Sequence, residues 1–186
     1  MAPRAAARLE SLGFTEVFEY KAGKLDWLAA GLPTEGENST RPRAGDASRK
    51  DVVVCGLKER LGDVRDRANA TGKMGSPRTH GEASELVGLW NLAVVIDEKR
   101  VVLGLLRSKQ LDMDPNLLVE KAMRPGPSTF RTYVPIKEMA DYLVEHELDS
   151  APITTSDGKL VGVLFKTDAI RLAASAAASA RRMIIP

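Results

Sequence analysis

Two apolar runs separated by a polar turn stand out near the end of the chain. Residues 151–153 are apolar, residues 156–158 read Ser-Asp-Gly, and residues 160–165 are mostly apolar again. Asp-Gly between two short β-rich runs predicts a hairpin. Asp168 then opens a segment rich in Ala, Ile and Leu, and acidic residues are favoured in the first turn of a helix. The pattern therefore predicts strand, turn, strand and helix.

The same pattern occurs earlier in the chain. Residues 93–96 are apolar, 97–100 are charged and 101–106 are mostly apolar, so that Gly104 lies 58 positions before Gly162 without a gap in the alignment. Each hairpin follows apolar residues at helical spacing, which predicts an amphipathic helix. These are Leu57, Leu61, Val64 and Ala68 in the first copy and Ile136, Met139, Ala140 and Leu143 in the second. The chain is predicted to be an internal duplication.

This repeat unit of strand, helix, strand, strand and helix resembles the CBS domain, which is named after cystathionine β-synthase and normally occurs as a tandem pair, the Bateman module. The resemblance spans about residues 51–172 and includes the Gly-apolar-apolar-x-x-x-Asp ending from Gly162 to Asp168. It implies an α+β fold in which two repeats are related by a pseudo-twofold axis. We expect the first repeat at 51–122, the second at 123–173 and a tail at 174–186.

The first repeat is predicted to be the longer one. Leu61 corresponds to Ile136, which lies 75 positions later, whereas the hairpins are only 58 positions apart. The first repeat therefore carries an insertion of 17 residues (75 − 58), which lies in or near residues 72–90. We expect an exposed loop there, followed by a short helix.

The first 36 residues carry a second resemblance. Their pattern predicts a helix at 5–12, a strand at 16–20 and a helix at 25–30 that Gly31 and Pro33 would end. This order resembles the last helix, strand and helix of a rhodanese domain. It implies a small α/β remnant at 1–36, which the polar composition of residues 37–50 joins to the repeats as a linker.

A single cysteine, Cys55, follows that segment. A cysteine after a strand with a base nearby can be a reactive thiol, and Arg60 lies five residues further on. In rhodaneses, however, the cysteine-bearing loop precedes the part seen here, and Leu57 and Leu61 assign Cys55 to the first CBS repeat. We interpret Cys55 as structural. The less favoured alternative is an enzyme, either a sulfurtransferase that uses Cys55 or one whose catalytic half is encoded upstream of Met1.

Composition adds few constraints. The formal net charge is +2 with 28% charged residues, which gives little support for nucleic-acid binding. One cysteine excludes an internal disulfide and fits a reducing compartment. No segment reads as a signal peptide or a membrane span. His80 and His146 are isolated, so no metal site is predicted. We expect a cytoplasmic protein without nucleic-acid or membrane partners.

The CBS resemblance implies a ligand, because such pairs bind adenosine-containing molecules such as AMP, ATP or S-adenosylmethionine in clefts between the sheets. A carboxylate in the first turn of the final helix can accept hydrogen bonds from the ribose hydroxyls, and the N–H groups of that turn favour phosphate. Asp168 stands at this position, but Phe165 replaces the usual Ser or Thr three residues earlier. The other expected ligand-binding residues of the second repeat are Thr167, Ala151, Pro152, Ile153, Thr129 and Thr132.

The first repeat departs further from the family pattern. Arg107 stands at the hydroxyl position and Gln110 at the carboxylate position. Gln110 can still hydrogen-bond a ribose and Arg107 can reach a phosphate, but the usual charge pattern is lost, so we expect this half to be degenerate. The alternative for Asp168 is a residue that only starts a helix.

These residues predict a non-catalytic regulatory or sensory module that binds one adenosine-type ligand weakly and acts as a homodimer. No cofactor is required. Ligand bound across two repeats would favour one of their relative orientations. The alternative is a ligand-free dimerisation or scaffold module.

Overall fold

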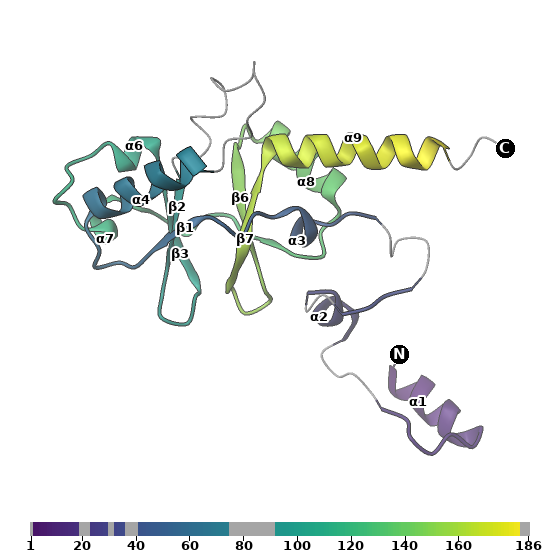
Figure 1. The fold of residues 1–186 in the computed structure, drawn as a ribbon. Helices are drawn as coiled ribbons and strands as arrows, with labels where there is room; N and C mark the ends of the chain where they lie inside the picture. Colours follow the sequence, from purple (N-terminus) through teal and green to yellow (C-terminus); the bar gives the residue numbers. More distant parts are fainter. Residues whose placement is uncertain (1, 19–22, 30–31, 36–40, 75–91, 183–186) are drawn as a thin grey trace.

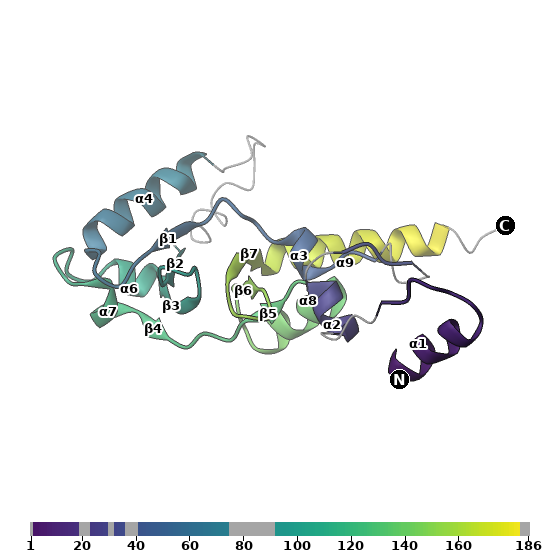
Figure 2. The ribbon, with the colours of Figure 1, turned by 90° about the horizontal axis from the view of Figure 1, so that it is seen from below.

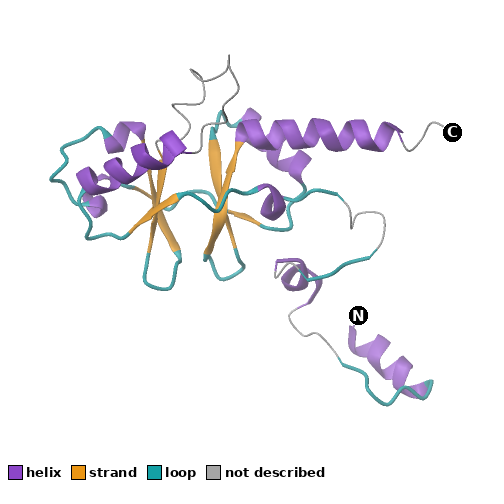
Figure 3. Ribbon diagram, viewed as in Figure 1, coloured by secondary structure: helices purple, strands orange, loops and turns teal. Residues whose placement is uncertain are grey.

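Two small β-sheets pack face to face, and helices cover their outer faces (Figures 1 and 3). This arrangement comes from a computed structural model that describes residues 2–18, 23–29, 32–35, 41–74 and 92–182. The predicted α+β class is confirmed. None of the helices within these residues is long and apolar enough to cross a membrane.

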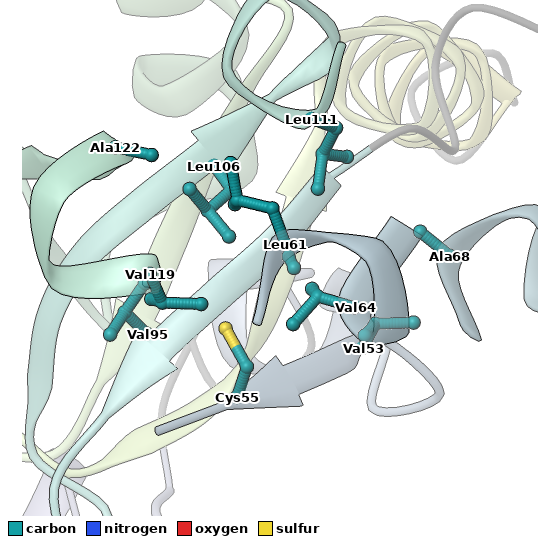
Figure 4. Packing of buried hydrophobic residues seen from close by; sticks show 11 residues of the cluster. Val53, Cys55, Leu61, Val64, Ala68, Val95, Leu106, Leu111, Val119 and Ala122 are labelled. Atoms are coloured by element: carbon teal, nitrogen blue, oxygen red, sulfur yellow. The ribbon is translucent and has the colours of Figure 1, made fainter. Parts of the chain in front are cut away.

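The first sheet and its helices contain most of the first repeat. Strand β1 runs parallel to β2, whereas β2 with β3 and β3 with β4 are antiparallel. The strands are β1 (Val53–Cys55), β2 (Leu92–Ile96), β3 (Val102–Arg107) and β4 (Arg124–Pro125), and the helices α4 (Leu61–Met74), α6 (Ser108–Leu111) and α7 (Val119–Ala122). Leu61, Val64 and Ala68, predicted as the apolar face of the first helix, are fully buried against this sheet (Figure 4).

The second sheet repeats this plan with three strands. Strand β5 runs parallel to β6, and β6 is antiparallel to β7. The strands are β5 (Phe130–Arg131), β6 (Ser150–Thr154) and β7 (Leu160–Phe165), and the helices α3 (Ala44–Ala47), α8 (Ile136–Glu145) and α9 (Lys166–Arg182). Helix α9 continues through the alanine-rich segment, as predicted, and includes most of the expected tail at 174–186; residues 183–186 lie outside the described part.

The strand registers confirm the duplication. Cys55 pairs with Val95 in the first sheet, and Phe130 pairs with Ile153 in the second. Phe130 lies 75 positions after Cys55, which is the offset expected before the insertion. Ile153 lies 58 positions after Val95, which is the offset expected after it. Both hairpins also have the same bulge, between Val95 and Ile96 and between Ile153 and Thr154. The 17-residue difference between the offsets therefore lies between the equivalent starts of α4 and α8 and those of β2 and β6: α4 has 14 residues against 10 in α8, and the remaining 13 extra residues belong to the chain between α4 and β2, where residues 75–91 lie outside the described part.

Each repeat's opening segment packs on the sheet of the other repeat. The offset of 75 relates α7 to α3, so we treat the segments that contain them as the openings of the two repeats, although both begin before the predicted boundaries at 51 and 123. The segment with α7 and β4 pairs with β3, while the segment with α3 ends at Arg49, which pairs with Val163 of β7. The N–H groups of Arg49 and Val163 each donate to the other's carbonyl oxygen at 2.9 Å. The expected linker at 37–50 is thus folded at residues 41–50, where Ala44 is fully buried.

A glycine in each hairpin permits this close approach. A Cβ atom at Gly162 would lie 2.5 Å from the carbonyl oxygen of Arg49, and one at Gly104 would lie 2.6 Å from the sulfur of Met123. Both distances are too short for a side chain. Gly104 and Gly162 align the two hairpins in the sequence. Each is required because the opening segment of the other repeat packs directly against it.

The two repeats meet at a central core and at the tips of their hairpins. The core contains Leu92, Val94, Leu105, Leu160, Val163 and Phe165. At the tips the N–H of Val102 donates to the carbonyl of Gly158 at 3.1 Å, and the N–H of Leu160 donates to that of Arg100 at 2.9 Å. Arg100 and Gly158 are equivalent positions of the two hairpins, 58 residues apart, and so are Val102 and Leu160. These reciprocal bonds mark the predicted pseudo-twofold axis.

Of the N-terminal helices, α2 (Gly23–Ala29) lies beside the second repeat, whereas α1 (Ala2–Ser11) stands apart from it (Figure 2). Both agree with the two predicted helices. The strand expected at 16–20 is not formed by residues 16–18, and residues 19–22 lie outside the described part. Phe18 is 89% exposed, so no sheet formed by the described residues covers it. The rhodanese resemblance stays a prediction.

Candidate functional site

A cleft of about 190 Å³ lies where the two repeats meet. Its walls come from the end of β3, the segment that follows β4 and the start of β6. We call it the inter-repeat cleft. Its main lining residues are Leu105, Arg107, Arg124, Ser150, Ala151 and Pro152, together with segment 125–128.

Arg107 is the central cation of this cleft. It precedes α6, and the side-chain oxygen of Gln110 accepts a hydrogen bond from the Arg107 N–H at 3.1 Å. The guanidinium donates to the carbonyl oxygen of Ser150 at 3.2 Å and to its hydroxyl at 3.5 Å. Burial lowers the pKa of Arg107; the carboxylate of Asp149 opposes this shift, and the charge of Arg124 adds to it. Arg107 of the first repeat thus contacts Ser150 of the second, and burial leaves its guanidinium only partly solvated.

The inter-repeat cleft combines two kinds of recognition. Arg107 and Arg124 offer guanidinium groups that suit phosphate or carboxylate, while Leu105, Ala151 and Pro152 offer apolar surface. The cleft is smaller than the roughly 300–1,000 Å³ of pockets that enclose drug-sized ligands. It therefore suits an anion with an apolar body that is only partly enclosed.

At the position related to this cleft by the pseudo-twofold axis, the described side chains contact one another. Asp168 is 7% exposed. One of its oxygens lies 2.6 Å from Nε of Arg49, and the other lies 2.8 Å from Nη2 of Arg171. Phe165 is buried in the central core, and the Arg49 guanidinium lies 5.5 Å from its ring centroid. Asp168 is thus engaged by arginines of the same chain.

The structure divides the predicted ligand-binding residues among several places. Arg107, Ala151 and Pro152 line the inter-repeat cleft, whereas Asp168 does not line it and Phe165 packs in the central core with Leu92 and Val94. The expected grouping of Asp168 with residues 151–153 is not seen, because the pseudo-twofold axis places the start of β6 beside the end of β3.

The other predicted residues lie apart from the cleft. Ile153 is fully buried among the helices of the second repeat. Thr132 lies beside α3, where its carbonyl oxygen accepts a hydrogen bond from the N–H of Gly45 at 2.9 Å. Thr167 is exposed on α9, Thr129 is half-buried just before β5, and Gln110 caps α6. None of these five residues lines the inter-repeat cleft.

Sequence reasoning missed Arg49, Arg124 and Ser150. Arg49 and Arg124 are separated by the same 75 positions as the equivalent helices, so the duplication itself marks them as counterparts. Arg49 forms an ion pair with Asp168, and Arg124 lines the inter-repeat cleft. Extending the repeat alignment upstream of residue 51 would have found both.

Cys55 lies in the core of the first repeat (Figure 4). Its thiol is 2% exposed, and its sulfur lies 3.9 Å from the carbonyl oxygen of Val94. The pKa of Cys55 is raised to about 12, mainly by burial and also by the charge of Glu59, while the charge of Arg67 acts in the opposite direction. A thiol protonated at neutral pH is a poor nucleophile, which supports the structural interpretation.

Comparison with known proteins agrees with this fold. Residues 119–175 match the family model described as CBS domain. The fold is similar to that of the cytosolic domain of the Mg²⁺ channel MgtE in complex with ATP, with 20% identity, a TM-score of 0.57 and coverage of 70% of this chain and 48% of that one. The chain thus spans about half the length of that structure. No curated protein was found with a similar sequence.

The matches to two further structures extend over almost the full length of those structures. One is CBSX2 in complex with AMP, with 18% identity, a TM-score of 0.55 and coverage of 72% of this chain and 97% of that one. The other contains the CBS domains of a transcriptional regulator from Streptococcus pneumoniae, with 15% identity, a TM-score of 0.55 and coverage of 69% and 97%. At these identities the similarity shows the fold. With the family match, it supports a tandem CBS protein.

Proposed function

We propose that this chain, whose fold is that of CBS pairs, is a non-catalytic regulatory module that binds an adenosine-type ligand in the inter-repeat cleft. The observation that carries the proposal is the presence of Arg107 and Arg124 beside apolar surface, in a cleft to which both repeats contribute. The proposed site therefore uses the first repeat's Arg107 rather than Asp168. AMP, ATP and S-adenosylmethionine remain the candidate ligands.

Charge and shape support a phosphorylated ligand over the others. A guanidinium forms bidentate hydrogen bonds with phosphate, and Ser128 and Ser150 line the same cleft. Pro152 and Leu105 offer flat apolar surface to a base. The names of two similar structures state that they hold ATP and AMP. We therefore favour AMP or ATP over S-adenosylmethionine, which is a cation at its sulfur.

The mechanism follows from the origin of the contacts. Arg107 belongs to the first repeat and donates to Ser150 of the second. A phosphate at Arg107 would compete with this contact and would touch both repeats at once. A ligand that binds one relative orientation better than another shifts the population towards it. We propose that this shift is the regulatory output, transmitted to a partner or through a homodimer in the cytoplasm.

We expect one ligand per chain and modest affinity. Phe165 and the ion pair between Arg49 and Asp168 occupy the equivalent place on the other side of the pseudo-twofold axis. The small volume of the inter-repeat cleft leaves part of the ligand in solvent, and this limits the apolar surface that binding can bury.

Calorimetry with AMP, ATP, adenosine and S-adenosylmethionine tests the proposal. Arg107→Gln should weaken AMP binding about tenfold, as expected for the loss of a charge-assisted hydrogen bond, and should change adenosine binding much less. Lys109→Ala is the matched control, because Lys109 is an exposed cation on the adjoining helix. Absence of heat with every ligand, alongside a stable dimer in sedimentation, would overturn the proposal and favour the scaffold alternative.

A further inference from the structure

A second and larger cavity, of about 760 Å³, lies in the first repeat at the carboxyl ends of β1 and β2. Its walls are the end of β1, the loop at 56–59 that precedes α4, and the turn at 96–99 that follows β2. None of its lining residues belongs to the second repeat or to the inter-repeat cleft. We call it the β1–β2 cavity.

The equivalent place in the second repeat is filled. The ring of Phe130 packs edge-on against the ring of Tyr142, with centroids 4.8 Å apart. The guanidinium of Arg131 crosses to the end of β6, where it donates to the hydroxyl of Thr154 at 2.7 Å and to the carbonyl oxygen of Thr155. An aromatic pair and a guanidinium thus occupy this end of the second sheet.

The first repeat has different residues at these positions. The strand registers make Cys55 the counterpart of Phe130 and Gly56 the counterpart of Arg131. Arg67 corresponds to Tyr142 by the same offset of 75 positions. Cys55, Gly56 and Arg67 all line the β1–β2 cavity. The space is therefore open because the thiol of Cys55 replaces the phenyl ring of Phe130, and the hydrogen atom of Gly56 replaces the side chain of Arg131.

The walls of the cavity define the body of a ligand. Val54, Cys55, Leu57 and Ile96 form a mainly apolar lining. A Cβ atom at Gly56 would have only Glu59 Oε1 within 4 Å, at 3.8 Å, so that wall is not closed by neighbouring side chains. A planar aromatic group fits the place that the Phe130 ring occupies in the other repeat.

The lining carries three acids, Glu59, Asp97 and Glu98, and three bases, Lys58, Arg67 and Lys99. One oxygen of Asp97 accepts hydrogen bonds from the N–H groups of Lys99 and Val101, at 2.9 and 2.7 Å. Glu59 accepts a hydrogen bond from the Gly56 N–H at 2.7 Å and pairs with Arg67. These bonds hold the carboxylates of Glu59 and Asp97 in fixed positions, and Arg67 balances the charge of Glu59. The ammonium groups of Lys58 and Lys99 have no ion-pair partner among the described residues. They can attract a carboxylate.

We propose that the β1–β2 cavity is a binding site for a small aromatic carboxylate. The ring lies against the apolar wall, and the carboxylate lies towards Lys58 and Lys99. This site is independent of the proposed nucleotide site, with which it shares no residue. The first repeat would thus sense an aromatic anion at the hairpin-turn end of its sheet.

Indole-3-acetate is a suitable probe, and its uncharged amide, indole-3-acetamide, is the matched ligand control. Titration of the full chain by calorimetry should show indole-3-acetate binding about tenfold more tightly than the amide, because the charge-assisted bonds are lost in the amide. Replacing both Lys58 and Lys99 by Ala should reduce this preference to near unity. Lys109→Ala should leave it unchanged.

Gly56→Arg restores the residue found at the equivalent position of the second repeat and should abolish binding of indole-3-acetate. Circular dichroism and the unfolding midpoint check that this variant is folded. AMP binding should be unchanged in it, which separates this proposal from that for the inter-repeat cleft. Wild-type affinity for indole-3-acetate in Gly56→Arg, equal binding of acid and amide, or loss of indole-3-acetate binding in Arg107→Gln would each overturn the proposal.

Discussion

Single residues decide how closely the two repeats interlock, and Gly162 shows this directly. Its backbone lies so near Arg49 that a Cβ atom would come within 2.5 Å of a carbonyl oxygen. We predict that Gly162→Ala lowers the free energy of unfolding by about 1–3 kcal/mol, which is typical of overpacking. The measurement is a urea titration followed by circular dichroism.

Gly56→Ala is the control for that experiment, since a Cβ at Gly56 would meet only Glu59 Oε1, at an ordinary contact distance of 3.8 Å. It should leave stability unchanged or raise it slightly, because alanine restricts the unfolded chain. Equal destabilisation by both substitutions would contradict the role given to Gly162, since it would show a general cost of replacing glycine in this fold.

The buried thiol of Cys55 makes a prediction about pH. Its pKa is raised from 9.0 to about 12 in the folded state. The unfolded chain therefore loses this proton first as pH rises, so the stability associated with the protonated thiol is present below pH 9.0 and is lost between pH 9.0 and about 12. In this window the unfolding free energy of Cys55→Ala should fall less steeply with pH than that of the wild type.

A thiol-reactive dye provides a second measurement on Cys55. At pH 8 it should label the native chain far more slowly than the urea-unfolded chain, because the thiol is both buried and protonated. Rapid labelling of the native chain would contradict the structural interpretation of Cys55 and would reopen the enzymatic one.

At the scale of elements, the ion pair between Arg49 and Asp168 fixes α3 and its following segment to α9. Asp168 is nearly buried, whereas the Arg49 side chain is 29% exposed. Partial exposure reduces the value of an ion pair, so we predict a coupling energy of about 1 kcal/mol in a double-mutant cycle with Arg49→Ala and Asp168→Ala. The cycle is measured by urea unfolding of the four proteins.

The pair Lys137–Asp141 is the control for this cycle, because both of its side chains are exposed on α8. Its coupling should be about 0.3–0.5 kcal/mol. A coupling for Arg49 and Asp168 no larger than this value would show that the exchanged segment is held mainly by its backbone bonds to Val163 and by the burial of Ala44.

The elements that sequence reasoning predicted well are those with a strong period. Both hairpins and the helices around Val64 and Met139 were predicted because their apolar faces repeat along the chain. Helix α3 was missed because its packing depends on small residues such as Ala44 and on backbone bonds, which leave no apolar period. The strand expected at 16–20 failed over residues 16–18, since an alternating pattern needs a partner strand.

The candidate site was harder to predict for a related reason. Asp168 and Arg107 were recognised by their positions in each repeat, but their neighbours come from the opposite repeat. The residues that face Asp168 and Arg107 depend on how the two repeats pack against each other, which is a property of the tertiary structure. The filled position at Phe165 and the open cleft at Arg107 therefore became distinguishable only with the structure.

At the scale of the whole molecule, neither repeat is complete without the other's opening segment. A chain that begins at residue 51 would lack α3 and Arg49, and would leave the N–H and carbonyl groups of Val163 without those partners. We predict that this truncation aggregates or unfolds in one step well below the full chain's midpoint, while a chain that begins at residue 41 keeps most of the stability. Thermal unfolding of both fragments checks this.

The hydrogen bonds between the hairpin tips have a consequence for motion. They hold the repeats together beside Val102, while Arg107 and the inter-repeat cleft lie at the other end of the same strand. Five residue steps of an extended strand make a lever of about 17 Å. With the tips as a hinge, a rotation of about 5° would displace the far end by roughly 1.5 Å over that lever. Small changes in how the repeats meet are thus amplified at the cleft.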